Sequence, residues 1–330
     1  MFSRNLGPFS VSPVSLGCMN LSHAYGTPPS KEDASRLLNE ALDQGYTMMD
    51  TAALYGFGSN EELLCQAIGH RRSEYMLASK CGMFKNDAGV REIDGRPEVL
   101  KKTCEDSLRR LGTDVIDLYY LHRWDKKVPI EDSIGALSDL VKEGKIQTIG
   151  LSEVSSDTLK KAHSVHPIAA VQTEYSLWTR NAEISVLNTC RDLGATFVAF
   201  SPVARGFLCG AVSDPNAFEE KDIRRGMPRF QGENFEKNKA LLSAYGDIAK
   251  EVGCTMAQLA LAWVLGQDEN IVAIPGTKNI QHMKENFAAA RVDLSAEQMR
   301  RLDALINQKT VSGPRYNAAT QAEIDTEEFV

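Results

Sequence analysis

Four side chains capable of acid–base chemistry stand at, or just beyond, the ends of three apolar runs. Asp50, Lys80 and His122 each end one run, and Tyr55 follows Asp50 after a short loop. A buried carboxylate must be paired or hydrogen-bonded, which makes Lys80 the candidate partner of Asp50. The pattern predicts that the four side chains share one site.

These residue types together suit proton transfer to a carbonyl group. A tyrosine hydroxyl has a reference pKa of about 10, too high to exchange protons efficiently near neutrality. An ammonium such as that of Lys80 stabilises the phenolate and is expected to lower the pKa of Tyr55. The Asp50 carboxylate would keep Lys80 charged despite burial. A neutral His122 would orient a carbonyl oxygen or relay a proton. We therefore expect a general-acid site.

Alternating apolar runs and helical patterns indicate the elements that position these residues. The predicted strands cover residues 14–18, 46–50, 75–80, 115–121, 145–151, 168–173, 195–200 and 270–276. The predicted helices cover 30–45, 59–69, 97–111, 131–143, 156–165, 183–193, 235–252, 256–268, 279–290 and 295–307. The runs are continuously apolar, as strands buried on both faces require. Eight such units in about 250–300 residues predict an α/β fold, a (β/α)8 TIM barrel.

The alternative fold is a doubly wound open sheet. It would need a glycine-rich nucleotide fingerprint after the first strand, but the chain there reads only GCMN. No linker or composition shift divides the chain, so we expect one domain over residues 1–330. A short hairpin is expected within residues 1–13. Extra helices and a polar, acidic tail from Lys309 onward, lying over the surface, are expected at the C-terminus.

In a barrel, the residues at the C-terminal ends of the strands face the active site. In chain order those ends carry Asp50, Lys80, His122, Ser152, Gln172, Ser201 and Gly276. Each polar residue alone is also consistent with an ordinary buried polar group or strand end. Six polar strand ends in succession favour one shared site over six unrelated polar positions.

Composition narrows the class of protein. The 330 residues are 43% hydrophobic, with a formal net charge of −7 and no basic stripe, which argues against nucleic-acid binding. Seven scattered cysteines lack a C-x-x-C pair, and no metal-ligand spacing appears, so we expect free thiols and no metal. No apolar stretch approaches the length of a membrane span, and no export signal is recognisable. A cytoplasmic enzyme for small molecules is expected, with its oligomeric state left open.

The motifs resemble those of the aldo-keto reductases, which are NAD(P)H-dependent enzymes on a (β/α)8 barrel. The resemblance runs from about Val14 to Asn286. It rests on D-T-A-x-x-Y-G at 50–56, L-H-x-x-D at 121–125, G-L-S at 150–152, V-Q at 171–172, F-S-P at 200–202, I-P-G at 274–276 and E-N at 285–286. Residues 224–238 look like the branch that includes pyridoxal reductase and perakine reductase.

The resemblance implies that Tyr55 is the general acid, tuned by Lys80 and Asp50, with His122 orienting the substrate. It implies NADPH as the cofactor, with NADH as a possible substitute. The cofactor-binding positions it implies are Cys18, Met19, Asp50, Ser152, Gln172, Phe200, Ser201, Pro202, Val203, Arg205, Gly206, Leu208, Gly276, Lys278, His282, Glu285 and Asn286.

The resemblance also implies what some of these residues would bind. Ser152 and Gln172 match residues that hydrogen-bond the nicotinamide carboxamide. Glu153 stands where relatives often have asparagine, and its carboxylate would accept from the carboxamide NH₂. Arg205 would supply charge to the pyrophosphate, and Lys278 would meet a 2′-phosphate. The aromatic residues past the strand ends are expected to line the substrate pocket: Phe57, Phe84, Trp124 and Trp178.

The leading hypothesis is reduction of aldehydes or ketones to alcohols by hydride transfer from NADPH. One alternative is a cofactor-binding regulatory subunit on the same barrel, which the complete set of four residues disfavours. Another is a Schiff-base aldolase with Lys80 as nucleophile. An Asp50 partner would keep Lys80 protonated and unreactive, which counts against that chemistry.

Overall fold

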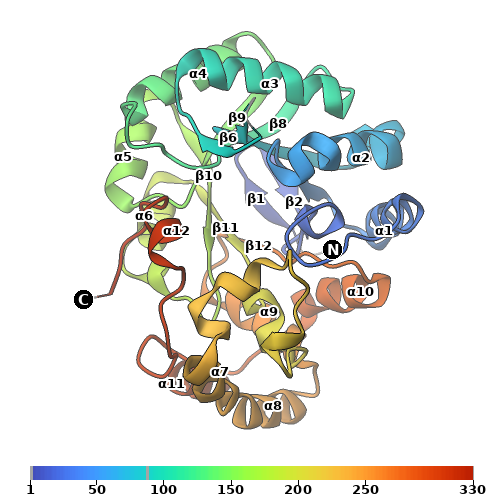
Figure 1. The fold of residues 1–330 in the computed structure, drawn as a ribbon, viewed down its shortest axis with the longest axis vertical. Coiled ribbons are helices and arrows are strands. Elements are labelled where there is room, and N and C mark those ends of the chain that lie inside the picture. The colour runs from blue at the N-terminus through green and yellow to red at the C-terminus, as the bar shows by residue number, and fades with distance from the viewer. Residues whose placement is uncertain (1–2, 87–88, 330) are drawn as a thin grey trace.

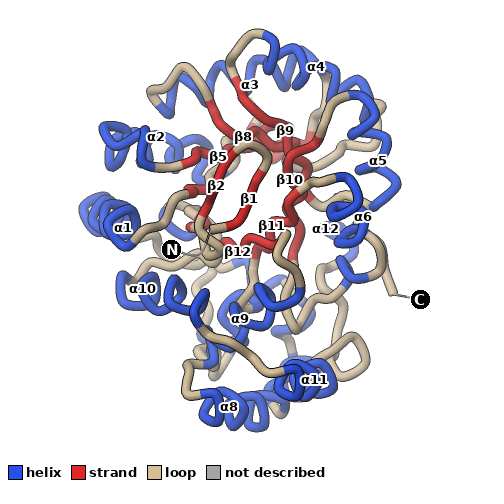
Figure 2. The backbone as a smooth tube through the Cα atoms, turned by 180° about the vertical axis from the view of Figure 1, so that it is seen from behind, coloured by secondary structure: helices blue, strands red, loops and turns tan. Residues whose placement is uncertain are grey.

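The computed structural model describes residues 3–86 and 89–329 and forms a closed barrel of eight parallel strands (Figure 2). The strands are β3 (Leu16–Gly17), β4 (Met48–Asp50), β5 (Met76–Cys81), β8 (Ile116–Leu121), β9 (Ile146–Ser152), β10 (Ile168–Glu174), β11 (Thr196–Phe200) and β12 (Ile271–Ile274). Hydrogen bonds from Ser15 N to Ala273 O (2.8 Å) and from Ala273 N to Pro13 O (2.9 Å) join the first strand to the last. The predicted TIM barrel is confirmed.

Helices surround the barrel (Figure 1). They are α1 (Lys31–Gln44), α2 (Ser59–Ile68), α3 (Pro97–Leu111), α4 (Ile130–Lys142), α5 (Ser156–Val165), α6 (Val186–Leu193), α7 (Gly232–Lys239), α8 (Leu241–Val252), α9 (Met256–Gln267), α10 (Ile280–Ala288), α11 (Ala296–Leu305) and α12 (Ala318–Gln321). The single helix expected over 235–252 is divided into α7 and α8. The sequence did not predict α12, nor the hairpin of β6 (Met83–Lys85) and β7 (Arg91–Ile93).

Local signals explain most helix boundaries. Ser30 caps α1 by accepting from Asp33 N, and Gly45 ends that helix in the left-handed region at φ 107°. Ser59 is the first residue of α2, and Gly58 occupies the N-cap position of that helix. The preceding turn, Tyr55–Gly58, includes Phe57 and two glycines at positive φ and delivers the chain straight into the helix.

The N-terminal hairpin closes the bottom of the barrel. Its strands β1 (Arg4–Leu6) and β2 (Phe9–Val11) lie across the ring of strands in Figure 2. Leu6 and Val11 pack with inward-facing side chains of the barrel, which are Met48, Met76, Ala78, Leu118, Tyr120, Ala170, Val198, Val272 and Ile274. The hairpin predicted within residues 1–13 is present, although residues 1 and 2 lie outside the described range. With this end filled, the opposite end is available for a site.

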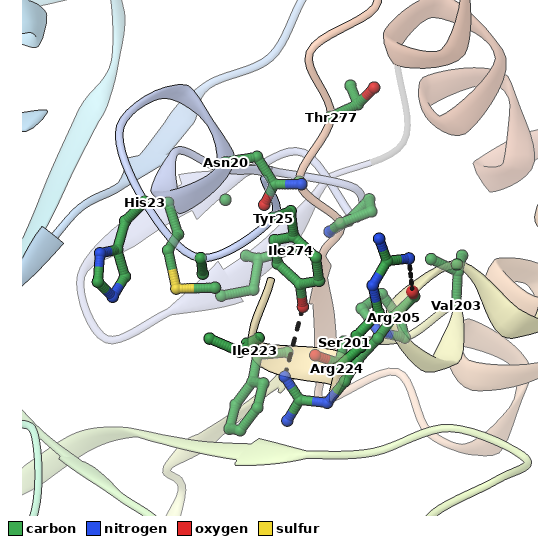
Figure 3. Close-up of a pocket in the computed structure, with 18 of the residues that line it drawn as sticks. Asn20, His23, Tyr25, Ser201, Val203, Arg205, Ile223, Arg224, Ile274 and Thr277 are labelled. Atoms are coloured by element: carbon green, nitrogen blue, oxygen red, sulfur yellow. Dashed lines mark hydrogen bonds between the residues drawn. The ribbon is translucent and has the colours of Figure 1, made fainter. Parts of the chain in front are cut away.

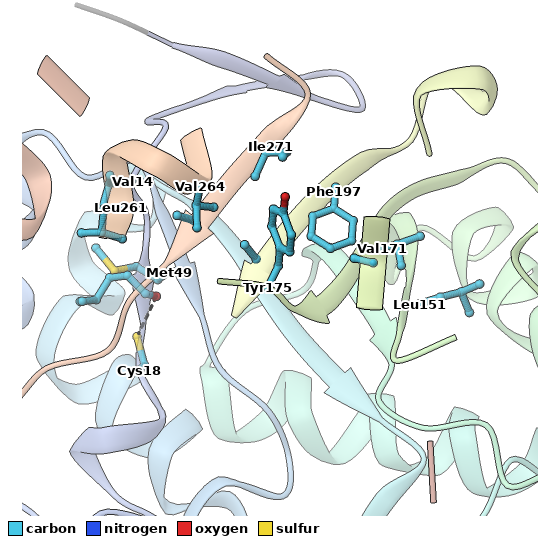
Figure 4. Close-up of a cluster of buried hydrophobic side chains, with 14 of the residues drawn as sticks. Val14, Cys18, Met49, Leu151, Val171, Tyr175, Phe197, Leu261, Val264 and Ile271 are labelled. Carbon is cyan, nitrogen blue, oxygen red and sulfur yellow. Dashed lines mark hydrogen bonds between the residues drawn. The ribbon is translucent and has the colours of Figure 1, made fainter. Parts of the chain in front are cut away.

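A second hydrophobic layer fills the space between the strands and the helices. Figure 4 shows part of it, with Val171, Tyr175 and Phe197 among side chains from neighbouring strands. The rings of Tyr175 and Phe197 meet edge-on, with centroids 5.7 Å apart. Burial of this layer is the main term that holds the helices on the barrel.

The C-terminal tail departs from the expectation that it lies over the surface. Arg315 and Tyr316 are buried at the C-terminal end of the barrel, and Ile324 is buried beside α5. Asp325 accepts hydrogen bonds from Ser155 and Thr158 at the start of that helix. The tail is therefore part of the packed structure around the strand ends.

Among the described residues, no single helix has the length and hydropathy that a membrane span needs. The bent pair Gly232–Val252 and Met256–Gln267 meets that test jointly, with 81° between its two parts.

Candidate active site

Alternation along the strands places the polar strand-end residues inside the barrel. Successive side chains of a strand point to opposite faces. Cys81, Leu151 and Val171 accordingly belong to the outer layer under the helices. The residues next to them in the chain, which are Lys80, Ser152 and Gln172, are buried on the inner side, as is Asp50. Because all of these strands are parallel, the four side chains gather at one end.

Lys80 is the centre of a hydrogen-bonded cluster. Its Nζ donates to a carboxylate oxygen of Asp50, to the carbonyl oxygen of Thr51 at 2.9 Å and to the hydroxyl of Tyr55 at 3.2 Å. Gln172 donates to the second carboxylate oxygen of Asp50 at 2.7 Å. Lys80 is 0% exposed and Asp50 is 1% exposed. An ammonium has three donors, so all three are used. The Tyr55 hydroxyl accepts here, which leaves its own proton free to be donated.

Burial and neighbouring charges have opposite effects on the pKa of Lys80 and on that of Tyr55. Burial lowers the pKa of Lys80, but Asp50 and Tyr55 together outweigh that effect, so the pKa of Lys80 lies above its ordinary value. Burial raises the pKa of Tyr55, and the neighbouring Lys80 ammonium only partly opposes that rise. The expectation that Lys80 brings the pKa of Tyr55 below its ordinary value is therefore wrong. Lys80 limits the rise instead.

His122 lies beside Tyr55, with the two rings edge-on and their centroids 5.9 Å apart. Its backbone N donates to Cys81 O at 2.9 Å, which fixes the residue directly after β8. Burial, reinforced by the positive charges of Arg123 and Lys80, holds the pKa of His122 well below its ordinary value. The imidazole is therefore neutral at pH 7. Within the described residues its buried Nδ1 has no hydrogen-bond partner.

A cavity of about 1100 Å³ opens above this cluster. The residues singled out in the sequence that line it are Met19, Asp50, Tyr55, His122, Ser152, Gln172, Phe200, Ser201, Pro202, Val203, Arg205, Gly206, Gly276, Lys278, His282, Glu285 and Asn286. Lys80 lies behind Asp50 and Tyr55, fully buried. One cavity thus joins the acid–base cluster to the positions expected to bind a cofactor.

Three segments meet at this cavity in Figure 3, which places Tyr25 opposite Arg205 and Arg224. Arg205 donates to the hydroxyl of Tyr25 at 3.3 Å, and Arg224 donates to the carbonyl oxygen of Arg205 at 3.1 Å. The backbone N of Ile223 donates to Ala24 O at 2.9 Å. The loop after β3, the loop after β11 and the segment before α7 are therefore joined by hydrogen bonds at the cavity.

The loop after β11 has an unusual backbone. Ser201, Ala204 and Arg205 have φ values of 50°, 50° and 56°, in the left-handed region that residues other than glycine rarely occupy. Such conformations cost about 1–3 kcal/mol each and persist where the surroundings enforce them, often at ligand sites. Two hydrogen bonds within the loop, from Ala204 N to Ser201 O and from Gly206 N to Val203 O, hold it in this shape.

Comparison with known proteins identifies the family. The aldo/keto reductase family model matches residues 13–307. The chain belongs to the aldo-keto reductase family. It is 42% identical over 309 residues to a probable aldo-keto reductase 1 from Glycine max, covering 93% of this chain and 89% of that one. It is also 42% identical over 321 residues to an NADP(+) aldo-keto reductase from Schizosaccharomyces pombe, covering 95% and 94% of the two chains.

Solved aldo-keto reductases share the fold as well. The structure of a glycerol dehydrogenase from Gluconobacter oxydans superposes with a TM-score of 0.84 at 29% identity, covering 94% of this chain and 97% of that one. An aldo-keto reductase from Klebsiella pneumoniae in complex with NADPH superposes with a TM-score of 0.73 at 27% identity, covering 96% and 99%.

Two residues expected to contact the cofactor of this aldo-keto reductase lie elsewhere. The side chain of Cys18 belongs to the outer hydrophobic layer, where burial holds the pKa of its thiol above the ordinary value. Leu208 is also part of that layer. Residues close to them in the chain, Met19 and Gly206, do line the cavity. Strand and turn geometry directs their own side chains outward.

The four aromatic residues expected in the substrate pocket also lie outside the main cavity. Trp178 is buried and stacks on Phe207, with centroids 4.2 Å apart. Phe57 is 50% exposed, with the ammonium of Lys85 4.8 Å from the centre of its ring. Phe84 is half-buried in β6, and Trp124 lines a separate hollow of about 310 Å³. Aromatic side chains stabilise loops by packing against any available apolar surface. This packing explains why Trp178 is buried against Phe207 and does not line the cavity.

Glu153 takes part in a buried charge cluster instead of lining the cavity. Arg315 of the tail donates to Glu153 at 2.7 Å and to Glu174 at 3.0 Å. Arg205 donates to the same Glu174 carboxylate at 2.6 Å, and the pKa of Glu174 is held far below its ordinary value, since the arginines outweigh burial. The expected contact of Glu153 with a carboxamide is therefore wrong, because Arg315 already occupies its carboxylate. Arg205 is likewise partly committed to Glu174.

Lys278 lines the cavity, but its ammonium already has protein partners. It donates to Tyr25 O at 3.2 Å and to Thr27 O at 2.9 Å. Two of its three donors therefore hold the loop after β3. One donor is left for a ligand.

Several cavity residues were missed in the sequence. They are Asn20, Tyr25, Arg91, Arg123, Arg224, Tyr316 and Glu323. Arg123 directly follows His122 in the L-H-x-x-D motif, so its position beside the site could have been inferred from the sequence. Tyr316 and Glu323 come from the tail, where no periodicity or motif marks them.

Proposed function

We propose that this aldo-keto reductase reduces aldehydes or ketones to alcohols with NADPH, and that Tyr55 is the general acid. The observation that supports this most is the hydrogen bonding of Tyr55. Its hydroxyl accepts from the Lys80 ammonium at 3.2 Å, so its proton is available on the cavity side. A neutral His122 lies next to it.

The cavity suits an extended dinucleotide. Ligand pockets commonly measure about 300–1000 Å³, and this one, at about 1100 Å³, has room for a cofactor and a small substrate. We propose that Ser152 and Gln172 would hold the carboxamide. Arg205 and the left-handed loop after β11 would hold the pyrophosphate, and Lys278 the 2′-phosphate. The Schizosaccharomyces pombe relative is named for NADP(+), and the Klebsiella pneumoniae structure contains NADPH, which supports NADPH over NADH.

The proposed reaction balances as one hydride and one proton added across a C=O bond. NADPH, when bound, supplies the hydride to the carbonyl carbon. His122 orients the carbonyl oxygen, and Tyr55 donates its proton to that oxygen as the C–O single bond forms. Lys80 stabilises the resulting phenolate, and Asp50 keeps Lys80 charged. Alcohol oxidation is the reverse, with the phenolate as general base.

Initial rates with a panel of aldehydes and ketones, measured separately with NADPH and NADH, test the proposal. We expect carbonyl-dependent oxidation of NADPH, with NADH used less well. Binding of NADPH without turnover of any carbonyl would favour the regulatory-subunit alternative. For the aldolase alternative, the three hydrogen bonds of Lys80 leave its ammonium no free position, so borohydride should trap no adduct at Lys80.

The preference for NADPH should depend on Lys278. In the Lys278→Ala variant, we expect the dissociation constant for NADPH to rise about tenfold or more. The reason is that a charge-assisted hydrogen bond to a phosphate contributes about 1.5–3 kcal/mol. The constant for NADH should change much less. Fluorescence titration measures both constants.

The matched control is Lys284→Ala, because Lys284 lies in α10, the helix that begins just after Lys278, and it pairs with Glu40 of α1 instead of lining the cavity. It should leave both constants unchanged. Equal weakening of NADPH and NADH by Lys278→Ala would mean that Lys278 only holds the loop at Tyr25 and Thr27.

A further inference from the structure

The part of the cavity around Tyr55 and His122 is lined or backed by three cationic side chains, Lys80, Arg91 and Arg123. Two of them have carboxylate partners. Lys80 pairs with Asp50. Arg91 pairs with Glu323 of the tail through Nη1 and Nη2, with the Nη1 contact at 2.9 Å. Their charges are therefore locally balanced.

Arg123 differs from these two. Its Nη1 donates to His122 O at 2.8 Å and to the hydroxyl of Ser152 at 3.0 Å. Across residues 3–86 and 89–329, no carboxylate forms an ion pair with it, and its Nε and Nη2 have no hydrogen-bond partner. The guanidinium is thus anchored through one nitrogen, while its other edge keeps two donors. Its charge is the unbalanced one at this end of the cavity.

The remaining edge of Arg123 has the geometry of a carboxylate receptor. Nε and Nη2 form a planar fork whose two parallel N–H groups match the two oxygens of a carboxylate. The fork is also preorganised, because the contacts with His122 and Ser152 restrict the side chain. A chain with a net charge of −7 has no general attraction for anions. Any attraction for a carboxylate at this point therefore comes from Arg123 itself.

We propose that the substrates of this site are aldehydes or ketones that carry a carboxylate, and that Arg123 binds that carboxylate through Nε and Nη2. This inference rests on the proposed reductase function and names its substrate class. The competing role for Arg123 is positional, namely holding Ser152 for the cofactor carboxamide. A positional role would affect all carbonyl substrates equally, whereas carboxylate binding affects only the anionic ones.

The test compares acids with their uncharged esters. The probes are 2-, 3- and 4-carboxybenzaldehyde and the methyl ester of each, assayed with saturating NADPH. For each isomer, the kcat/KM of the acid is divided by that of its ester, which cancels effects common to both. In the wild type we expect a ratio above one for at least one isomer. In Arg123→Met that ratio should fall about 10- to 100-fold, the equivalent of one charge-assisted contact. In Arg123→Glu it should fall below one.

Arg36→Met is the matched control, since it removes one positive charge from an exposed position on α1, where Arg36 forms an ion pair with Asp33. Its ratio should equal that of the wild type. If acids and esters are both reduced but Arg123→Met leaves the ratio unchanged, or if no wild-type ratio exceeds one, the inference is overturned while the reductase function stands. If neither acids nor esters nor other carbonyls are reduced, the proposed function itself has failed.

Discussion

Replacing Tyr55 by phenylalanine is expected to lower kcat for carbonyl reduction by about 10²–10⁴-fold, the usual contribution of a general acid. The hydroxyl of Tyr55 is held by Lys80 at 3.2 Å and faces the cavity, so its loss removes the proposed proton donor. NADPH binding should be retained, because the other cavity residues are unchanged. Turnover is measured at saturating NADPH, and the dissociation constant is measured by fluorescence.

A suitable control is Tyr46→Phe, which also removes one buried tyrosine hydroxyl. That hydroxyl donates to Met283 O at 2.8 Å in the outer hydrophobic layer. The control should lose about 1 kcal/mol of stability and keep its turnover. Near-wild-type turnover of Tyr55→Phe would show that another group donates the proton.

Replacing Lys80 by methionine is expected to reduce both stability and activity. Without Lys80, the carboxylate of Asp50, which is 1% exposed, would still accept a hydrogen bond from Gln172 but would lose its countercharge. Breaking a buried ion pair from one side costs about 3–5 kcal/mol. Urea unfolding followed by circular dichroism measures the loss in the free energy of unfolding.

The same variant should change the pH dependence of alcohol oxidation. Burial raises the pKa of Tyr55 and Lys80 opposes that rise, so the pKa of Tyr55 should be higher without Lys80. The phenolate that acts as base in oxidation then forms at higher pH. The pH at which oxidation reaches half its maximum should therefore move upward.

Lys101→Met provides the comparison, because the pair of Lys101 with Asp139 is at the surface. Surface pairs contribute about 0–1 kcal/mol, so stability and pH profile should hardly change. Wild-type stability together with a wild-type pH profile in Lys80→Met would exclude Lys80 from the catalytic cluster.

The sequence by itself determined the barrel and its acid–base cluster. Both depend on short-range patterns, namely continuous apolar runs, helix caps such as Ser30, and the polar residues that end six of the strands. Parallel pairing of strands then brings Asp50, Lys80, Ser152 and Gln172 together without further information. The helices at 97–111 and 156–165 were predicted with the boundaries that the structure has, since proline, serine and glycine signals mark their ends.

Only the tertiary structure decided what surrounds that cluster. The tail at Arg315 and Tyr316 pairs with Glu153, Glu174 and Arg205, residues more than 100 positions away in the chain. These contacts join loops that have no periodicity, so no local pattern predicts which loops meet. The packing of an aromatic residue is equally undetermined, because an apolar ring such as that of Trp178 is stabilised by any apolar neighbour, and the fold alone decides which neighbour that is.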